Sequence, residues 1–255
     1  MTNLLDRPVI FFLVAFVFFA AAAWIGERVA ARRTTVADED RDEFNLVQGA
    51  TLTLLGLIIG FTFSMALNRY DQRKNYEEEE ANAIGTEYLR ADLLPEADAA
   101  KVRGLLKRYL DERVKFYTLR DDDELAKSDA ATAKLQAELW AAVKAPALAQ
   151  PSPVTALAVS GMNDVLNTQG YTQAAWWNRI PTSAWALMAA ISICANVLVG
   201  LGAKKTNRRT ALFLVMPFVV ALAFFLIADI DAPRRGVILV KPQNLQSLVQ
   251  SLRSQ

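Results

Sequence analysis

Four consecutive glutamates, Glu77 to Glu80, follow Asp71 closely in this sequence. Carboxylates this close together can form a solvated surface, attract cations if their helix repeats around an axis, or act as a general acid and base pair. Four adjacent residues cannot share one helix face, so some of these side chains must face solvent. No nucleophile, metal-ligand set or oxyanion donor is recognisable beside them, so catalysis is the least favoured of the three hypotheses.

A row of small and polar residues precedes the acidic run, at spacings of three or four residues. Its members, called here the small-residue row, are Gly49, Thr53, Gly56, Gly60, Ser64 and Asn68. Gly49, Gly56 and Gly60 are typical of a helix-packing seam in lipid, within one chain or between subunits. The alternative is a pore-lining face, in which Thr53, Ser64 and Asn68 offer oxygens to a hydrated ion beside an apolar constriction.

A third group of charges stands after the last apolar segment. It consists of Asp229, Asp231, Arg234 and Arg235. Ionisable groups at a membrane boundary usually pair with one another or reach the lipid headgroups. We expect structural ion pairs that close the preceding helix, and docking against an extramembrane helix is the alternative.

Composition restricts the chemistry that this chain can perform. The 255 residues include no His and one Cys, Cys194, which excludes a disulfide framework and a His/Cys zinc site. Without His, the commonest general base is also missing. We therefore predict a protein that is not an enzyme and that holds neither a cofactor nor a metal. A net charge of +1 also gives no basic field for nucleic acid.

The elements that position these residues are membrane helices. About 20 apolar residues are needed to cross the hydrocarbon core of a bilayer. Four segments meet this requirement: residues 8–26, 44–67, 182–201 and 210–228. We interpret the first as a retained anchor rather than a signal peptide, because further spans follow it. Residues 1–68 then hold the first two transmembrane helices, and residues 181–229 hold the third and fourth.

Residues 69–180 are too charged for lipid and show helical spacing of apolar residues, without the alternation that strands require. We predict that the second span continues as a helix to Pro95, and that further helices follow, one of which ends near Pro146. Residues 146–153 read as a loop, and another helix covers 154–178. The tail, 230–255, contains an extended stretch at 237–240 and then either a short amphipathic helix or a loosely ordered end.

The fold class predicted is therefore all-α, with four transmembrane helices and a helical extramembrane domain inserted between the second and third. The short loops 27–43 and 202–209 are rich in Arg and Lys, but the opposite flanks of the spans carry nearly as many. The positive-inside rule consequently favours neither orientation.

Several sequence segments resemble the bestrophin-like group of bacterial membrane proteins over most of the chain. They are LNRYDQR, EEANAIGTEYLRADLLP, NRIP with Trp185, and DIDAPRRG. A smaller set is similar to true bestrophin channels, whose second membrane helix carries a Gly-Phe pair nine residues before Arg-Trp-Trp. Gly60-Phe61 and Arg69-Tyr70 keep that spacing.

The resemblance to bestrophins implies a pentamer with an axial pore lined by the second helix. It places a hydrophobic neck at Phe61, Leu57 and Thr53, although Thr53 differs from the apolar residue that the family prefers. Tyr70-Asp71 replaces the paired Trp, and the glutamate run favours cations where bestrophins prefer anions. Shared architecture does not by itself transfer function.

Two functions of different classes fit these features. The first is a homo-oligomeric ion channel or pore in a bacterial inner membrane, surrounded by lipid, with inorganic ions passing along the second span. In this hypothesis Asp71 and Glu77 to Glu80 form a charged vestibule. The second is a non-conducting membrane scaffold or sensor whose helical domain binds a partner. A secondary transporter would need a broken helix or a paired charge at mid-membrane, and no span contains one.

Overall fold

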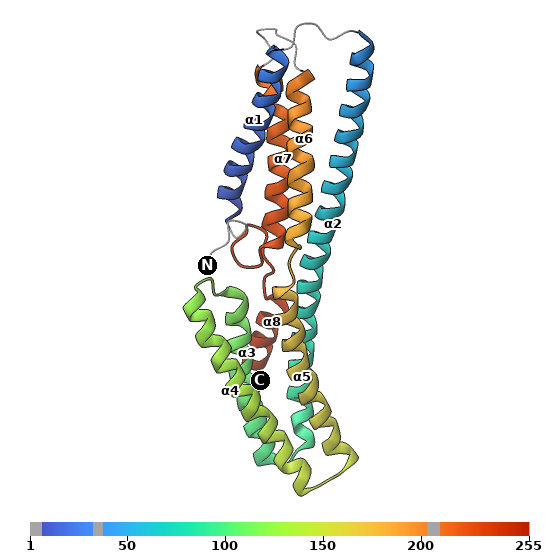
Figure 1. Ribbon diagram of the computed structural model, residues 1–255. Coiled ribbons are helices and arrows are strands. Elements are labelled where there is room, and N and C mark those ends of the chain that lie inside the picture. The colour runs from blue at the N-terminus through green and yellow to red at the C-terminus, as the bar shows by residue number, and fades with distance from the viewer. Residues whose placement is uncertain (1–6, 33–37, 203–209, 255) are drawn as a thin grey trace. The chain divides into compact units, whose positions relative to one another are not determined.

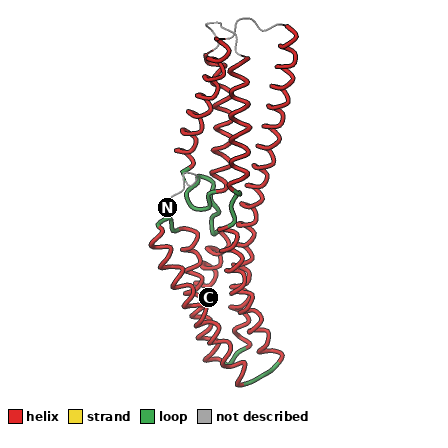
Figure 2. The backbone as a smooth tube through the Cα atoms, viewed as in Figure 1, coloured by secondary structure: helices red, strands yellow, loops and turns green. Residues whose placement is uncertain are grey.

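The computed structural model describes residues 7–32, 38–202 and 210–254 of the chain (Figure 1). These residues form helices and loops, and the described ranges contain no strand (Figure 2). The helices are α1 (Pro8–Arg32), α2 (Asp38–Arg90), the short 3-10 helix η2 (Ala91–Leu93), α3 (Glu96–Thr118), α4 (Asp122–Ala149), α5 (Pro153–Trp177), α6 (Thr182–Gly202), α7 (Thr210–Asp231) and α8 (Gln243–Arg253). The predicted all-α fold is confirmed. Parts of both basic loops, 33–37 and 203–209, lie outside the described residues.

The chain divides into two compact units. The membrane unit comprises Met1–Asn68 and Arg179–Ile238, and the extramembrane unit comprises Arg69–Asn178 and Leu239–Gln255. Helix α2 contributes residues to both. No helix breaker stands between its apolar and charged parts, which is why a single helix of 53 residues forms.

Four helical stretches of the described chain are long and apolar enough to cross a membrane. They are Pro8–Arg32, Arg41–Leu93, Pro153–Gly202 and Phe213–Asp231. Each overlaps one of the four predicted spans. The extramembrane helices α3 and α4 lie between the second and third of these stretches in the sequence, and the third stretch itself begins with the extramembrane helix α5 (Pro153–Trp177).

Helices α1 and α6 cross closely within the membrane unit because both carry glycine at the crossing. A Cβ atom on Gly26 would overlap the carbonyl oxygen of Val197, and one on Gly200 would overlap the carbonyl oxygen of Ala23. Such small residues allow the two backbones to approach closely. In lipid this close packing holds helices together, because the hydrophobic effect does not act between them. Ring contacts join α1 to α7, including Phe19 and Phe224, whose centroids are 5.2 Å apart.

The extramembrane unit has its own apolar core. Buried side chains from α2, η2, α3, α4, α5 and α8 form it, among them Ile84, Leu106, Leu139, Met162 and Leu245. Local signals begin two of its helices. The Asp121 side chain accepts hydrogen bonds from two backbone amides at the start of α4, and Ser152 and Thr155 form a capping box before α5.

Two local predictions about loops need correction. Pro146 lies inside α4, which continues to Ala149, so the loop predicted at 146–153 covers only residues 150–152. Proline removes one backbone donor but does not interrupt α4, and the carbonyl of Pro146 accepts from the amide of Gln150 where the helix ends. Of the extended stretch predicted at 237–240, residues 237 and 238 form bends, and the amphipathic alternative for the tail is realised as α8.

Candidate functional site

The membrane part of α2 has one buried face. Leu55, Thr62 and Ala66 are each no more than 3% exposed. Their spacings of seven and four residues keep them on one side of a helix with 3.6 residues per turn. The hydroxyl of Thr62 donates to the carbonyl of Ile58 at 2.8 Å, which satisfies this polar group inside the apolar contact.

The small-residue row occupies the opposite side of α2. All six of its residues are exposed in the single chain. A Cβ atom added at Gly49, Gly56 or Gly60 would meet no described atom of the chain within 4 Å. One form of the packing hypothesis placed the helix-packing seam within a single chain. The described residues show no such contact at the three glycines. The described part of the chain therefore leaves the row uncovered.

Large apolar side chains flank this row. Leu57 is 53% exposed and Phe61 is 64% exposed, one helical turn apart. The hydroxyl of Thr53, one turn before Leu57, donates to the carbonyl of Gly49 at 2.9 Å. Its oxygen lone pairs remain available, because a hydroxyl that donates can still accept. The row thus combines oxygen ligands with two bulky apolar groups.

The acidic run divides between two faces of α2. Glu78 and Glu79 are exposed, as is Asp71, whereas Glu77 and Glu80 are buried in the extramembrane unit. Ser64, Asp71 and Glu78 follow one another at intervals of seven residues, which is about two helical turns. The exposed carboxylates therefore continue the small-residue row beyond the apolar part of the helix.

Glu77 holds the beginning of α8. Its two carboxylate oxygens accept hydrogen bonds from the backbone amide of Leu245 at 2.9 Å and from the side-chain amide of Asn244 at 2.7 Å. A carboxylate at a helix N-terminus satisfies free amide groups and interacts favourably with the helix dipole. This contact and the burial of Leu245 and Leu252 attach α8 to the core.

Glu80 forms a buried ion pair with Arg113 of α3, and both side chains are fully buried. The carboxylate also accepts hydrogen bonds from the hydroxyls of Tyr117 at 3.4 Å and Thr172 at 3.3 Å. Burial, together with the Glu80 charge, raises the pKa of the Tyr117 phenol, so Tyr117 remains a neutral donor. The Arg113 guanidinium lies over the ring of Phe116, 4.4 Å from its centroid. This network joins α2, α3 and α5.

The aspartates at the end of α7 close that helix, mainly through backbone amides. Asp229 accepts from the amides of Val237 at 2.6 Å and Ile238 at 2.8 Å, which holds the turn that contains Gly236. Asp231 accepts from the amide of Ile180 at 3.1 Å and pairs with Arg179 at 3.4 Å. Arg234 and Arg235 are half-buried in the same turn.

Sequence reasoning missed three of these partners. Arg113 and Thr172 lie 33 and 92 residues from Glu80 along the chain, and Arg179 lies about 50 residues before its partner Asp231. A single sequence holds no local signal for such distant pairs. An Arg on an apolar helical face, such as Arg113 among Tyr109, Leu110 and Phe116, is the one feature that could have suggested a buried ion pair.

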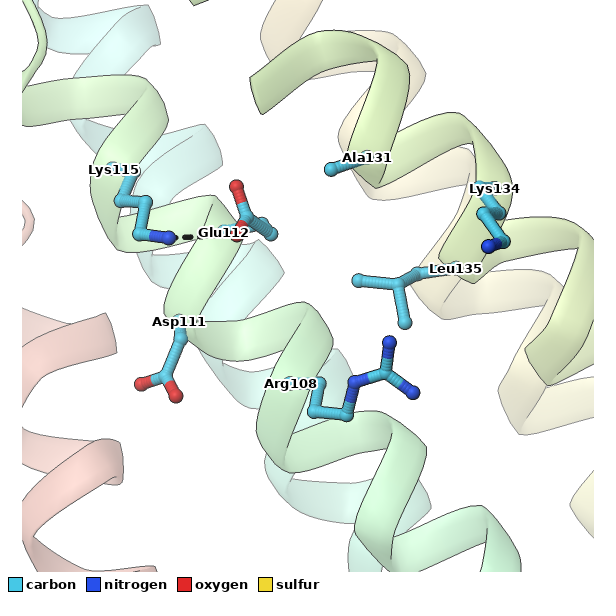
Figure 3. A pocket seen from close by; sticks show the side chains of 7 residues that line it. All are labelled: Arg108, Asp111, Glu112, Lys115, Ala131, Lys134 and Leu135. Atoms are coloured by element: carbon cyan, nitrogen blue, oxygen red, sulfur yellow. Dashed lines mark hydrogen bonds and ion pairs between the residues drawn. The ribbon is translucent and has the colours of Figure 1, made fainter. Parts of the chain in front are cut away.

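A cavity of about 360 Å³ lies between α3 and α4 (Figure 3). Its lining includes Lys115, which donates to Glu112 at 2.8 Å, and Arg108 and Lys134, which pair with Glu138 at 3.7 and 3.9 Å. Because carboxylates already neutralise these cations, the cavity offers little attraction for an anion. Among the described residues, no group of three or more acidic, His or Cys side chains could hold a metal ion.

These features define a multi-span integral membrane protein in which one helix presents an uncovered row of small and polar residues. Residues 13–245 match the family described as "Bestrophin-like domain". The chain belongs to this family.

Solved structures share its fold. A bestrophin homologue from Klebsiella pneumoniae, in a single-residue variant, is 12% identical with a TM-score of 0.67, covering 96% of this chain and 99% of that one. Another structure of a bestrophin homologue from the same organism is 13% identical with a TM-score of 0.61, covering 97% and 98%. A crystal structure described as a membrane protein variant is 12% identical with a TM-score of 0.61, covering 97% of each chain. No curated protein matches the sequence.

Proposed function

We propose that this protein is a subunit of a homo-oligomeric ion channel or pore, with α2 lining the path. One observation carries the proposal: the small-residue row is uncovered in the single chain and lies opposite the buried face of α2. A face that contacts lipid alone would gain nothing from Thr53, Ser64 and Asn68, since polar groups in hydrocarbon are costly. Copies of α2 around an axis would instead enclose these groups with water and ions.

In this arrangement Leu57 and Phe61 form the neck. Their exposed apolar side chains would narrow the path enough for it to lose water, which is one way that channels gate. Asp71, Glu78 and Glu79 would supply charge at the mouth. Glu77 and Glu80 are assigned no such role, because the extramembrane core buries them.

The proposed number of subunits and the proposed membrane both rest on resemblance to related proteins. Resemblance to bestrophins supports a pentamer, and resemblance to the bacterial bestrophin-like group supports the bacterial inner membrane. Gly49, Gly56 and Gly60 then allow close approach of neighbouring α2 helices.

The purified oligomer in planar lipid bilayers tests the proposal. We expect single-channel currents; their absence across a range of pH and voltage, in a preparation shown to be oligomeric, would contradict it. That outcome would favour the non-conducting scaffold or sensor.

Currents would also allow a test of the neck. Phe61→Ala should change conductance or gating, because it removes a ring that faces the path. Phe63→Ala is the matched control: Phe63 is less exposed, at 38%, and two residues along a helix turn it about 160° away from Phe61. If the two variants have the same conductance and gating, Phe61 does not form part of the neck.

A further inference from the structure

Glu87 is a buried acid in the extramembrane unit that none of the features above uses. It lies near the end of α2 and is 0% exposed. Neither of its carboxyl oxygens has a hydrogen-bond partner in the described chain. An ionised carboxylate in such surroundings has lost its hydration without replacement, so the neutral acid is strongly favoured there.

The space for this carboxyl group exists because α5 has glycine opposite it. A Cβ atom on Gly161 would overlap both the Oε2 atom of Glu87 and the side chain of Arg90. Gly161 is itself buried, as is Ala158 one turn before it. The residue of α5 that lies against the Glu87 carboxyl group therefore has no side chain that could donate a hydrogen bond.

The charged groups around Glu87 compensate its negative charge only in part. Arg90 of α2 pairs with Asp164 of α5 at 3.8 Å. At the same end of the bundle, Arg103 of α3 pairs with Asp92 of η2 and donates to the carbonyl of Tyr88 at 3.4 Å. Burial raises the pKa of Glu87 to about 8; the positive charge of Arg90 opposes this shift, and the negative charge of Asp164 adds to it.

We propose that Glu87 is a proton-binding site that keeps α5 packed against α2, and that loss of its proton loosens this contact around Gly161. The physical reason is local. The ionised carboxylate requires water or hydrogen-bond donors, and Gly161, the residue of α5 against it, supplies no side-chain donor. The two helices must therefore separate or admit water when the proton leaves. This inference is independent of whether the protein conducts ions.

The sign of the pH dependence follows from linkage. In the folded protein the pKa of Glu87 is raised above its ordinary value, so the folded state binds the proton more tightly than the unfolded state. The stabilisation is complete below the ordinary carboxyl pKa of about 4.5 and is lost as pH rises towards about 8. Within this interval the unfolding equilibrium constant should rise by up to about tenfold per pH unit from this group alone.

Infrared difference spectroscopy of the full-length protein in detergent, titrated across pH, tests the site directly. We expect the carbonyl stretching band of a protonated carboxyl group to persist at neutral pH and to disappear near pH 8. Glu87→Gln should lack this band. Glu96→Gln, which changes an exposed acid of α3, should keep it. Absence of a protonated-carboxyl band in the wild-type protein at neutral pH would overturn the proposal, whether or not any variant folds.

Hydrogen exchange tests the structural consequence. After correction for intrinsic exchange rates, the protection of α5 amides around Gly161 should decrease as the band disappears. Glu87→Gln should retain its protection over the same pH range, because an amide stays neutral. If wild type and Glu87→Gln lose protection in parallel, Glu87 does not control the contact between the helices.

Discussion

At the scale of single residues, four adjacent glutamates have different surroundings because helix geometry separates them. Glu77 and Glu80 are three positions apart and face the extramembrane core, while Glu78 and Glu79 face away from it. The buried pair replaces lost hydration with specific donors: two amides for Glu77, and a guanidinium and two hydroxyls for Glu80. Buried charges persist only with such partners.

The ion pair of Glu80 and Arg113 provides a stability prediction. Arg113→Met should lower the free energy of unfolding by about 3–5 kcal/mol, because it leaves the Glu80 carboxylate buried without its cation. The double variant Glu80→Met with Arg113→Met should lose much less than the sum of the single variants. Thermal unfolding followed by circular dichroism in detergent measures both.

An exposed pair serves as the control for this experiment. Lys134 and Glu138 are 3.9 Å apart at the surface, so Lys134→Met should change stability little. If Arg113→Met has an equally small effect, the buried pair does not contribute as described.

The exposed glutamates support a prediction about ion selectivity in the proposed pore. Glu78→Gln should weaken any preference for cations, because it removes negative charge in line with Ser64 and Asp71. Reversal potentials in asymmetric salt measure this preference. Glu124→Gln, at an exposed acid in the first turn of α4, should leave the potential unchanged. If the reversal potential of Glu78→Gln equals that of the wild-type protein, Glu78 is an ordinary solvated surface residue with no role in ion selectivity.

At the scale of helices, the glycines where α1 and α6 cross differ in role from those of the small-residue row of α2. Gly26 and Gly200 permit contact between two helices of the same chain, and no space remains for a side chain there. At Gly49, Gly56 and Gly60 of α2, an added Cβ atom would meet no described atom within 4 Å. Sequence alone showed the small-residue row of α2 but could not distinguish these two uses, because both produce the same spacing.

The crossing of α1 and α6 can be tested by one methyl group. Gly200→Ala should destabilise the protein by about 1–3 kcal/mol, because its Cβ overlaps the backbone of α1 and the helices must move apart. Gly170→Ala is the matched control, since this exposed glycine of α5 has no described neighbour within 4 Å. It should stabilise the helix by roughly 0.5–1 kcal/mol. Similar thermal unfolding of the two variants would contradict the close crossing.

At the scale of the whole molecule, the four spans and the helical insertion could be predicted from sequence because apolar length and helical spacing are local properties. The ends of helices were less accurate: Pro146 signals a stop, yet α4 continues past it. Partners distant in sequence could not be predicted. Glu80 and Thr172 are 92 residues apart, and only tertiary packing brings them together.

Assembly around α2 can be tested by cysteine cross-linking. In a Cys194→Ser background, Leu57→Cys should form disulfides between copies if α2 lines a shared axis. Leu55→Cys should not, because Leu55 is 1% exposed and faces its own chain. Non-reducing electrophoresis after mild oxidation distinguishes the two. Equal cross-linking at both positions, or at neither, would argue against α2 at the axis.

The contact between Glu77 and α8 also affects how the protein is made. Glu77 is synthesised 168 residues before Leu245, and its carboxylate accepts a hydrogen bond from the backbone amide of Leu245. During translation this carboxylate must therefore remain hydrated until Asn244 and Leu245 have been made, and the extramembrane core cannot close before α8 is available. The core of this unit therefore closes late relative to the synthesis of α2, after α6 and α7 have also been made.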